Sequence, residues 1–459
     1  MTSRFSLQFL FVSVCALIAL SFANPSFAAG GDMMGYFLPI PIFDRLESTG
    51  IWGAAGVIPR EIHNGLEDSS CKKWSYWDGS IIKGKNGKFH MYASRWDQTL
   101  GHAGWPQSVA IHAVSDNITG PYVDKGLLYT YSNGKGHNVV AIELPDGRIA
   151  VFCSDIVPGW VFIASDPNGP FTFQGEVKID LNGHTNATNL RTNMSICMRE
   201  DSTFLIVARD GYVMHSTSGI MGPYLVKTDK IWPMNLPGFN NTSWEDPCIW
   251  RVGKKYYCMV NNWSTKQAIY LTSDDGISNW KYVAKAYSPA TSNLFRYPDG
   301  TVNKWTKIER PGVYMENGHV TYLTFAVVDV EKEQDLGNDN HNSKVIVVPF
   351  DGKAFDGVTS IRSGGPVGEP GRTGPLVIDI AQRAHELRLD FSRTLPQGDL
   401  EVSLFHLTGR LMATVFMKKL SNMHLTLPLD RLELRTGVYV CRVKIGGRNA
   451  WAGEISLDR

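Results

Sequence analysis

The sequence predicts an all-β chain, a five-bladed β-propeller followed by a small antiparallel β-sandwich, and three observations support this prediction. An apolar strand, a Gly or Asp turn and a second apolar strand recur five times along the chain. A Ser-led turn and a further strand follow each of the first four repeats, and long runs of helical periodicity are absent. Two hairpins per repeat make a four-stranded sheet, and sheets that recur at this spacing are typical of propeller blades.

Each of the five repeats begins with a residue pair at the start of its first strand. These pairs are Trp77-Asp78, His137-Asn138, Thr192-Asn193, Glu245-Asp246 and Glu309-Arg310, and their second residues lie 60, 55, 53 and 64 positions apart. We expect the propeller to span residues 29–362. The region from about residue 29 to residue 75 is expected to supply the closing strand and part of the rim.

The two ends of the chain have different patterns. Residues 1–28 contain Arg4, an apolar run and small residues at Ser26 and Ala28, which predicts a secretory signal peptide and a secreted or cell-surface protein. No later segment is apolar over enough length to span a bilayer. Residues 363–375 form a Gly/Pro linker, and residues 376–459 read as the short strands of a β-sandwich.

Composition argues against several classes of partner and cofactor. The chain has 45 Lys+Arg and 44 Asp+Glu with no basic run, so no nucleic-acid partner is expected. The six cysteines after residue 28 are too few for a disulfide scaffold and lack zinc-site spacing. Residues 332–344 lack the spacing of a calcium loop. We therefore expect no cofactor and no metal site, while a calcium or other cation in the pore stays open.

The starts of the inner strands converge on one mouth of a propeller, so the carboxyls there are the candidate catalytic groups. Hydrolysis of a glycosidic bond needs a protonated acid and a carboxylate that activates water or attacks carbon. Crowded carboxyls raise one another's pKa, which allows this division of labour. We expect Asp78 to be the base and Glu245 the acid, with Glu309 as reserve acid or tuning group. The alternative is that these groups only cap an inert channel.

Other residues at the mouth are expected to bind a carbohydrate. Six tryptophans flank the mouths, and Trp77 and Trp244 are the best candidates for stacking on a sugar ring because each lies beside a carboxyl. Arg209 closes a strand at the mouth and could neutralise a uronate. His112, in mid-strand, is expected to be structural. The predicted substrate-binding set is Trp77, His137, Asn138, Asn193, Arg209, Trp244, Asp246 and Arg310.

Residues 70–352 resemble the five-bladed propeller glycosidases of glycoside hydrolase family 43 and its relatives, including neoagarooligosaccharide hydrolases. The resemblance rests on "YWDGSIIKGKNGKFHMYASRW", the "GPY" turns, "WEDPCIW" and "ERPGVY". It implies a base on the first blade and an acid on the fourth, which Asp78 and Glu245 match. It also implies an Asp on the third blade that tunes the acid, where this chain has Asn193. The resemblance thus implies a hydrolase of plant or algal polysaccharides or oligosaccharides.

Two further functions stay open, and the C-terminal part has a resemblance of its own. His112, His137 and Arg209 resemble the set of propeller polysaccharide lyases that cleave ulvan-like uronate polymers. Those lyases have seven blades and usually a Tyr ahead of the Arg, whereas this chain has no Tyr between Tyr131 and Tyr212. A non-catalytic glycan-binding propeller is the other alternative. The segment "LRTGVYVCRVKIGG" is similar to type IX secretion sorting domains, which implies outer-membrane secretion machinery as a partner; a spacer or carbohydrate-binding sandwich is the alternative.

Overall fold

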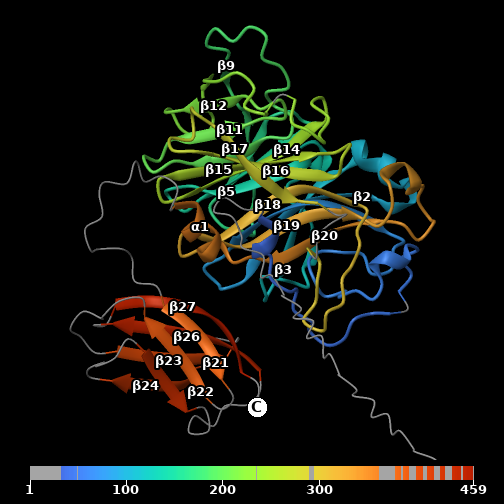
Figure 1. Ribbon diagram of the computed structural model, residues 1–459. Coiled ribbons are helices and arrows are strands. Elements are labelled where there is room, and N and C mark those ends of the chain that lie inside the picture. The colour runs from blue at the N-terminus through green and yellow to red at the C-terminus, as the bar shows by residue number, and fades with distance from the viewer. Residues whose placement is uncertain are drawn as a thin grey trace, which may run out of the picture. The chain divides into compact units, whose positions relative to one another are not determined.

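The computed structural model describes residues 33–48, 50–233, 235–288 and 294–360, together with the strands of the C-terminal part. The predicted signal peptide and linker lie outside the described residues. The chain divides into two compact units, residues 1–364 and 365–459 (Figure 1). It is mostly β, as predicted, with one α-helix in its described part. None of the described helices has the length and hydropathy needed to cross a membrane.

In the first two sheets of unit one, each strand pairs antiparallel with the next strand along the chain. The first contains β1 (Trp74–Lys83), β2 (Phe89–Asp97), β3 (Val109–Ser115) and β4 (Val123–Leu127). The second contains β5 (His137–Glu143), β6 (Ile149–Ser154), β7 (Trp160–Ala164) and β8 (Thr172–Glu176). Two short 3₁₀ helices, η3 (Gln98–Leu100) and η4 (His102–Gln107), connect β2 to β3, and η5 (Tyr131–Gly134) precedes β5.

Three more sheets follow in chain order. The third contains β10 (Ser195–Met198), β11 (Phe204–Val207), β12 (Val213–Ser216) and β13 (Tyr224–Val226), with β9 (Ile179–Asp180) added in parallel. The fourth contains β14 (Trp244–Val252), β15 (Lys255–Asn262), β16 (Gln267–Ser273) and β17 (Lys281–Tyr287). The fifth contains β18 (Lys307–Glu316), β19 (His319–Val328) and β20 (Ser343–Pro349), with η6 (Lys332–Gln334) between β19 and β20.

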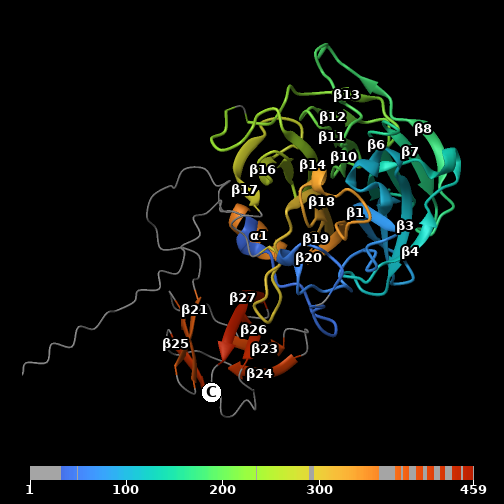
Figure 2. The same ribbon diagram turned by 90° about the vertical axis from the view of Figure 1, so that its right-hand side faces the viewer.

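The first strands of the five sheets contact one another in a closed ring. β1 contacts β5, β5 contacts β10, β10 contacts β14, β14 contacts β18, and β18 returns to β1. Figure 2 shows β1, β10, β14 and β18 near the centre of the unit and β4, β8, β13 and β17 towards its outside. Because each first strand runs beside its neighbours, the residues at its start are brought close to those of the other sheets.

The N-terminal region joins the fifth sheet differently from what the sequence predicts. In place of a closing strand, single antiparallel bridges join Phe37 to Phe350 and Leu66 to Val345. Gly65 has a φ of +73°, and a Cβ there would lie 1.9 Å from the carbonyl oxygen of Val345. The positive φ and the close approach to Val345 both require glycine at this place.

Apolar side chains fill the space between the sheets of unit one. The cluster against the fifth sheet includes Trp52, Tyr287 and Phe325, each nearly inaccessible to solvent. The helices η1 (Met33–Tyr36) and α1 (Gly352–Ser360) contact each other beside this cluster, and η2 (Ala55–Val57) contributes a buried valine. Both helices also contact strands, η1 contacting β17 and α1 contacting β19.

Unit two contains two sheets of short antiparallel strands. One has the order β21 (Ile378–Arg383), β22 (Glu386–Phe391), β25 (His424–Pro428). The other has the order β24 (Leu411–Met417), β23 (Leu400–His406), β26 (Gly437–Ile445), β27 (Arg448–Leu457). Leu389 of the first sheet and Val402 and Val443 of the second are buried, so both sheets contribute apolar side chains to the interior of the unit.

Candidate active site

The second residues of the five repeats share one backbone conformation. Asp78, Asn138, Asn193, Asp246 and Arg310 all have a positive φ, between 46° and 70°. In four sheets the register of the first hairpin shifts at this place, and in the third sheet the residue lies just before β10. A β-bulge bends the strand and redirects a side chain, and Asn and Asp tolerate this conformation well. The repeat in the sequence is therefore a repeat of backbone geometry.

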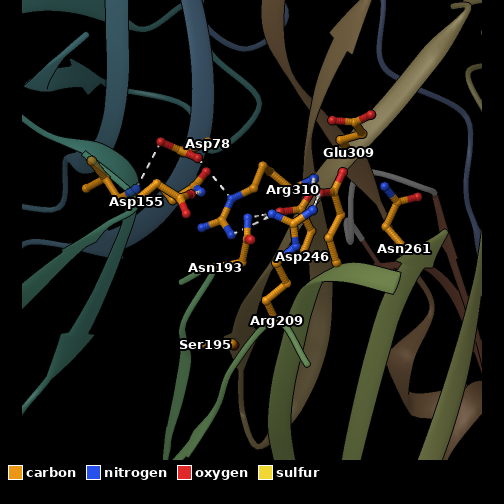
Figure 3. Close-up of polar contacts among 12 residues, drawn as sticks. Asp78, Asp155, Asn193, Ser195, Arg209, Asp246, Asn261, Glu309 and Arg310 are labelled. Carbon is orange, nitrogen blue, oxygen red and sulfur yellow. Dashed lines mark hydrogen bonds and ion pairs between the residues drawn. The ribbon is translucent and has the colours of Figure 1, made fainter. Parts of the chain in front are cut away.

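Four of these five side chains form one buried polar network across the ring. The guanidinium of Arg310 lies 3.0 Å from Asp78 Oδ1 through Nε and 3.3 Å from Asp246 Oδ1 through Nη1 (Figure 3). Asn193 Nδ2 donates to the same Asp246 oxygen at 2.7 Å. Burial opposes the charge of Arg310, but Asp78 and Asp246 outweigh it and raise the pKa of the guanidinium. Arg310 thus neutralises two carboxylates, one from the first sheet and one from the fourth.

Asp78 lies within this network and does not line the pocket described next. Its Oδ2 accepts hydrogen bonds from Ser94 Oγ and, at 2.9 Å, from the Val139 amide, while Oδ1 accepts from Arg310. The residue is 2% exposed. Burial raises the pKa of Asp78, opposed by Arg310 and these hydrogen bonds. Both carboxylate oxygens already have hydrogen-bond partners. In this geometry Asp78 is well placed to orient Arg310 and poorly placed to act as a base towards substrate.

A pocket of about 260 Å³ opens where the inner strands begin. Eight residues of the predicted site line it, namely Trp77, His137, Asn138, Asn193, Arg209, Glu245, Asp246 and Glu309. Four residues outside the predicted set join them, namely His102, Trp105, Asp155 and Lys332. We call this twelve-residue cavity the mouth pocket. Asp78, Trp244 and Arg310, also predicted, lie outside its lining.

Glu245, at the start of β14, has the environment of a proton donor. Burial raises the pKa of its carboxyl to about 8, with further contributions from Asp246 and Glu309. Arg209 Nη2 lies 3.2 Å from Glu245 Oε2 and partly offsets the shift. The surroundings therefore favour the protonated carboxyl, and its conjugate base has a cation beside it.

Glu309 is held by a residue that sequence reasoning did not select. Lys332 of η6 pairs with Glu309 Oε2, and its Nζ lies 5.1 Å from the ring centre of Trp77. Glu309 Oε1 is buried and has no hydrogen-bond partner among the described residues. Carboxylate oxygens of Glu245, Asp246 and Glu309 lie within 4.8 Å of one another, a spacing that a cation could bridge. Lys332 already supplies one positive charge there.

Asp155, half-buried like Glu245, also lines the mouth pocket, and the sequence analysis missed it. It follows Ser154, the last residue of β6, which pairs with His137 at the mouth. Asn138 Nδ2 donates to Asp155 Oδ2. Burial raises the pKa of Asp155 to about 6, opposed by Arg310. The sequence pattern could have identified Asp155. It follows the second strand of its repeat, as Arg209, which was selected, follows the second strand of the next repeat.

The histidines divide between the pocket and the interior. His137 Nδ1 lies 2.9 Å from Ser108 Oγ and its ring 5.0 Å from that of Trp105; burial lowers its pKa to about 3. His137 is therefore neutral. His112 lies outside the mouth pocket, where its Nε2 is 2.9 Å from Nδ1 of His90 and the rings stack. His112 thus lies apart from His137 and Arg209, which line the mouth pocket, and its structural role stays a prediction.

Trp244 does not line the mouth pocket, and its stacking on a sugar ring stays a prediction. Its ring stacks on Phe239 with centroids 5.3 Å apart, and the residue is 5% exposed within an apolar cluster. Successive side chains of a strand point to opposite faces, and Glu245 takes the pocket side. Trp105, from the η4 connection, is the more exposed tryptophan of the pocket lining.

The comparisons with known proteins give structural likenesses only. No family model and no curated protein matches the sequence. The catalytic domain of a Coprinopsis cinerea GH62 α-L-arabinofuranosidase is 11% identical, with a TM-score of 0.46 over 63% of this chain and 94% of that one. A family 117 glycoside hydrolase of Zobellia galactanivorans is 13% identical, with a TM-score of 0.42 over 63% and 88%. A compost-metagenome GH43 β-xylosidase/α-arabinofuranosidase is 12% identical, with a TM-score of 0.41 over 60% and 91%. At these values none of the likenesses bears on what this chain does.

Proposed function

We propose that the protein is a glycoside hydrolase whose catalytic unit is a five-bladed propeller and whose mouth pocket cleaves a plant or algal saccharide. One arrangement carries the proposal: two partly accessible carboxyls, Glu245 and Asp155, line the same pocket, and their surroundings raise the pKa of Glu245 further than that of Asp155. The pKa of Glu245 is raised to about 8 and that of Asp155 to about 6. Between these values one group is an acid and the other a base, as hydrolysis of a glycosidic bond requires.

In this mechanism Glu245 protonates the glycosidic oxygen as the bond from that oxygen to the anomeric carbon breaks. Where the two carboxyls stand far enough apart for a water molecule between them, that water attacks the anomeric carbon and gives its proton to Asp155, and the product has inverted configuration. Arg209, 3.2 Å from Glu245, stabilises the carboxylate that remains after proton transfer. His137, neutral and held by Ser108, is placed to hydrogen-bond the substrate.

The base is assigned to Asp155 in place of the predicted Asp78. Asp155 is half-buried and lines the mouth pocket, whereas Asp78 is 2% exposed and accepts bonds from three donors. Asp78 then positions Arg310, which in turn orders Asp246. Asp78 as base stays the alternative, and substitution separates the two assignments.

The test uses the purified chain and a panel of plant and marine glycans, read by reducing ends and ultraviolet absorbance. On an active substrate, Glu245→Gln and Asp155→Asn should each lower kcat by about 10²–10⁴-fold with an unchanged thermal midpoint. Glu245→Gln should lose far less on an aryl glycoside whose leaving group needs no protonation. Glu200→Gln, an exposed carboxyl outside the pocket, is the matched control. An active Asp155→Asn beside a folded, inactive Asp78→Asn would return the base to Asp78.

A polysaccharide lyase is the second candidate, because a neutral His137 and Arg209 share the mouth pocket. Elimination from a uronate polymer creates an unsaturated product that absorbs in the ultraviolet, whereas hydrolysis does not. His112, the other histidine of that set, pairs with His90 outside the pocket. Absorbance that grows during digestion of a uronate glycan, and grows equally with Glu245→Gln, would favour the lyase over the hydrolase.

We also propose that the chain is exported and that unit two is a sorting domain with a sandwich fold. The charge, apolar run and small residues of segment 1–28 support export, and the resemblance of the C-terminal strands to type IX sorting domains supports the second point. Expression in a bacterium with that machinery should yield a mature protein that lacks the first 28 residues. Retention of the full chain inside the cell would contradict both points.

A further inference from the structure

We propose that an aromatic surface on the outer part of the second sheet, formed by Tyr131, Trp160 and Phe173, binds a polysaccharide chain outside the mouth pocket. We call these three side chains the aromatic platform. The inference rests on the proposed function for the identity of the glycan, and it adds a second place on the propeller where that glycan is held. Three features support it: the stacking, the exposure and the position of the rings.

The platform is a stack of rings that begins in the core and ends at the surface. Tyr131 lies face to face with Phe173, with ring centroids 4.3 Å apart and planes inclined by 14°. Phe173 packs in turn on the buried ring of Phe162, 5.3 Å away. Trp160 is nearly equidistant from the pair, 5.2 Å from Tyr131 and 5.1 Å from Phe173. It therefore flanks the stack and leaves the outer face of Tyr131 uncovered.

The exposed apolar surface is contiguous. Tyr131 is 47% exposed, and Trp160 and Phe173 are half-buried. Leu127 of β4, also exposed, packs beside the same turn, since a Cβ at Gly134 would lie 2.7 Å from Leu127 Cδ2. The strand β8, which carries Phe173, lies towards the outside of unit one (Figure 2). Single exposed apolar side chains are ordinary, whereas a patch of several marks an interaction site.

The turn that carries Tyr131 has an unusual backbone. Ser132 has φ and ψ of 49° and 38°, and Asn133 has 57° and 31°, so two consecutive residues other than glycine are left-handed. This conformation is unfavourable, for Ser132 above all, and it persists only where the surrounding structure imposes it. Strained turns gather at functional sites, and this one presents the outermost ring of the platform.

The platform is close in sequence to the lining of the mouth pocket. Tyr131 precedes His137 by six residues, and Trp160 follows Asp155 by five. His137 and Asp155 both line the pocket. Six residues span at most about 20 Å even when fully extended, so the platform and the pocket lie within reach of one glycan chain.

An exposed ring at the pocket joins the two places. Trp105 lines the pocket, is 37% exposed and has its ring 5.0 Å from that of His137. Its connection is bonded to the segment between Tyr131 and His137: the Gly136 amide donates to the Ser108 carbonyl at 3.2 Å, and the Ser108 hydroxyl donates to the Gly136 carbonyl at 3.1 Å. A glycan that leaves the pocket on this side meets aromatic side chains.

The chemistry of the platform fits a sugar better than a protein surface. Aromatic rings pack on the apolar C–H faces of sugars, and polar groups at their edges bind the hydroxyls. The edges here carry the exposed side chains of Ser132 and Asn133, and Glu176, which is paired with Trp160 in register and has no ion pair within the described part of the chain. Three rings offer at most about 450–750 Å², below the roughly 800 Å² per partner of a standard protein interface.

The first experiment measures binding directly. The full chain is run in native gels that contain xylan, arabinan, galactan or ulvan, or the glycan that the activity screen selects. At least one glycan should retard it, and Tyr131→Ala should weaken the apparent Kd at least fivefold. Tyr131→Phe, which keeps the stacking face, should stay within twofold. Tyr282→Ala removes a 40% exposed tyrosine from β17 of the fourth sheet, and this matched control should bind as the wild-type protein does.

The second experiment compares two substrates of one variant. A 4-nitrophenyl glycoside is too short to reach from the pocket to the platform, whereas the polymeric glycan reaches both. The ratio of KM on the glycan to KM on the glycoside should therefore rise at least fivefold in Tyr131→Ala and recover in Tyr131→Phe. This ratio does not depend on the fraction of folded protein. An unchanged ratio would overturn the inference and leave the hydrolase in place.

The remaining outcomes are also decisive. Retardation that depends on Tyr131, with no turnover of any glycan, would reject the proposed hydrolase and keep the platform. Retardation that is equal in Tyr131→Ala, or absent with every glycan in the gels, would overturn the platform. A dimer that forms at micromolar concentration and dissociates in Tyr131→Ala, measured by sedimentation, would assign the surface to a second copy of the chain and overturn the inference as well.

Discussion

Arg310 is the residue whose removal should damage the ring most, because two buried carboxylates depend on it. Its side chain is 5% exposed and pairs with Asp78 and Asp246, whose side chains are 1% and 3% exposed. Removing one partner of a buried ion pair costs about 3–5 kcal/mol, because the other charge stays buried. Arg310→Met keeps most of the volume and removes the charge. We therefore expect a loss of unfolding free energy of about 3–5 kcal/mol at pH 7.5.

The loss should depend on pH in a defined direction. The pKa of Asp78 is raised by burial even with Arg310 present, and removing the guanidinium raises it further. A carboxyl whose folded pKa lies above its unfolded value loses stability as pH rises from the unfolded pKa through the folded one. The variant should therefore approach the wild-type protein as the pH falls towards 5 and diverge from it above neutrality.

The assay is urea unfolding of both proteins followed by tryptophan fluorescence at several pH values, with the change in the first unit fitted separately where two transitions occur. Arg148→Met is the matched control, since its pair with Asp146 is exposed and exposed ion pairs contribute little to stability. A loss below about 1 kcal/mol in Arg310→Met, or a loss that is the same at pH 5 and pH 7.5, would refute the reasoning.

Three further predictions concern the same unit. The rate kcat/KM should follow a bell-shaped pH profile, falling below about pH 6 as Asp155 takes up a proton and above about pH 8 as Glu245 loses one; a flat profile over this range would contradict the assignment. Burial lowers the pKa of His112 to about 4, so the neutral imidazole contributes stability above its unfolded pKa, and this contribution is lost as the pH falls from about 6.5 to 4. His112→Gln should therefore flatten this part of the curve of unfolding free energy against pH, measured by urea unfolding. Trp244→Ala should lower the unfolding free energy by about 3–5 kcal/mol, whereas Trp105→Ala should mainly raise KM with little change in the thermal midpoint; the reverse pattern would place Trp244 at the substrate.

The sequence by itself determined the strands and the residues that begin them. Each repeat has its own hairpin and its own polar or aromatic pair, so the signal is local and needs no knowledge of neighbouring sheets. Asn and Asp at four of the five second positions suit the positive φ found there, and Arg310 adopts it in the fifth. For the same local reason, eight predicted residues lie in the mouth pocket.

Only the tertiary structure decided which of these residues can act. Asp78 is a partner of Arg310 and not a free base because the fold brings together two residues 232 positions apart in sequence. Lys332 reaches Glu309 from a loop that the sequence analysis gave no role in the site. Trp244 and Glu245 are adjacent in sequence yet face opposite sides of one strand. Exposure and pKa depend on the groups that cover a side chain, and here those groups come from other sheets once the ring of first strands has closed.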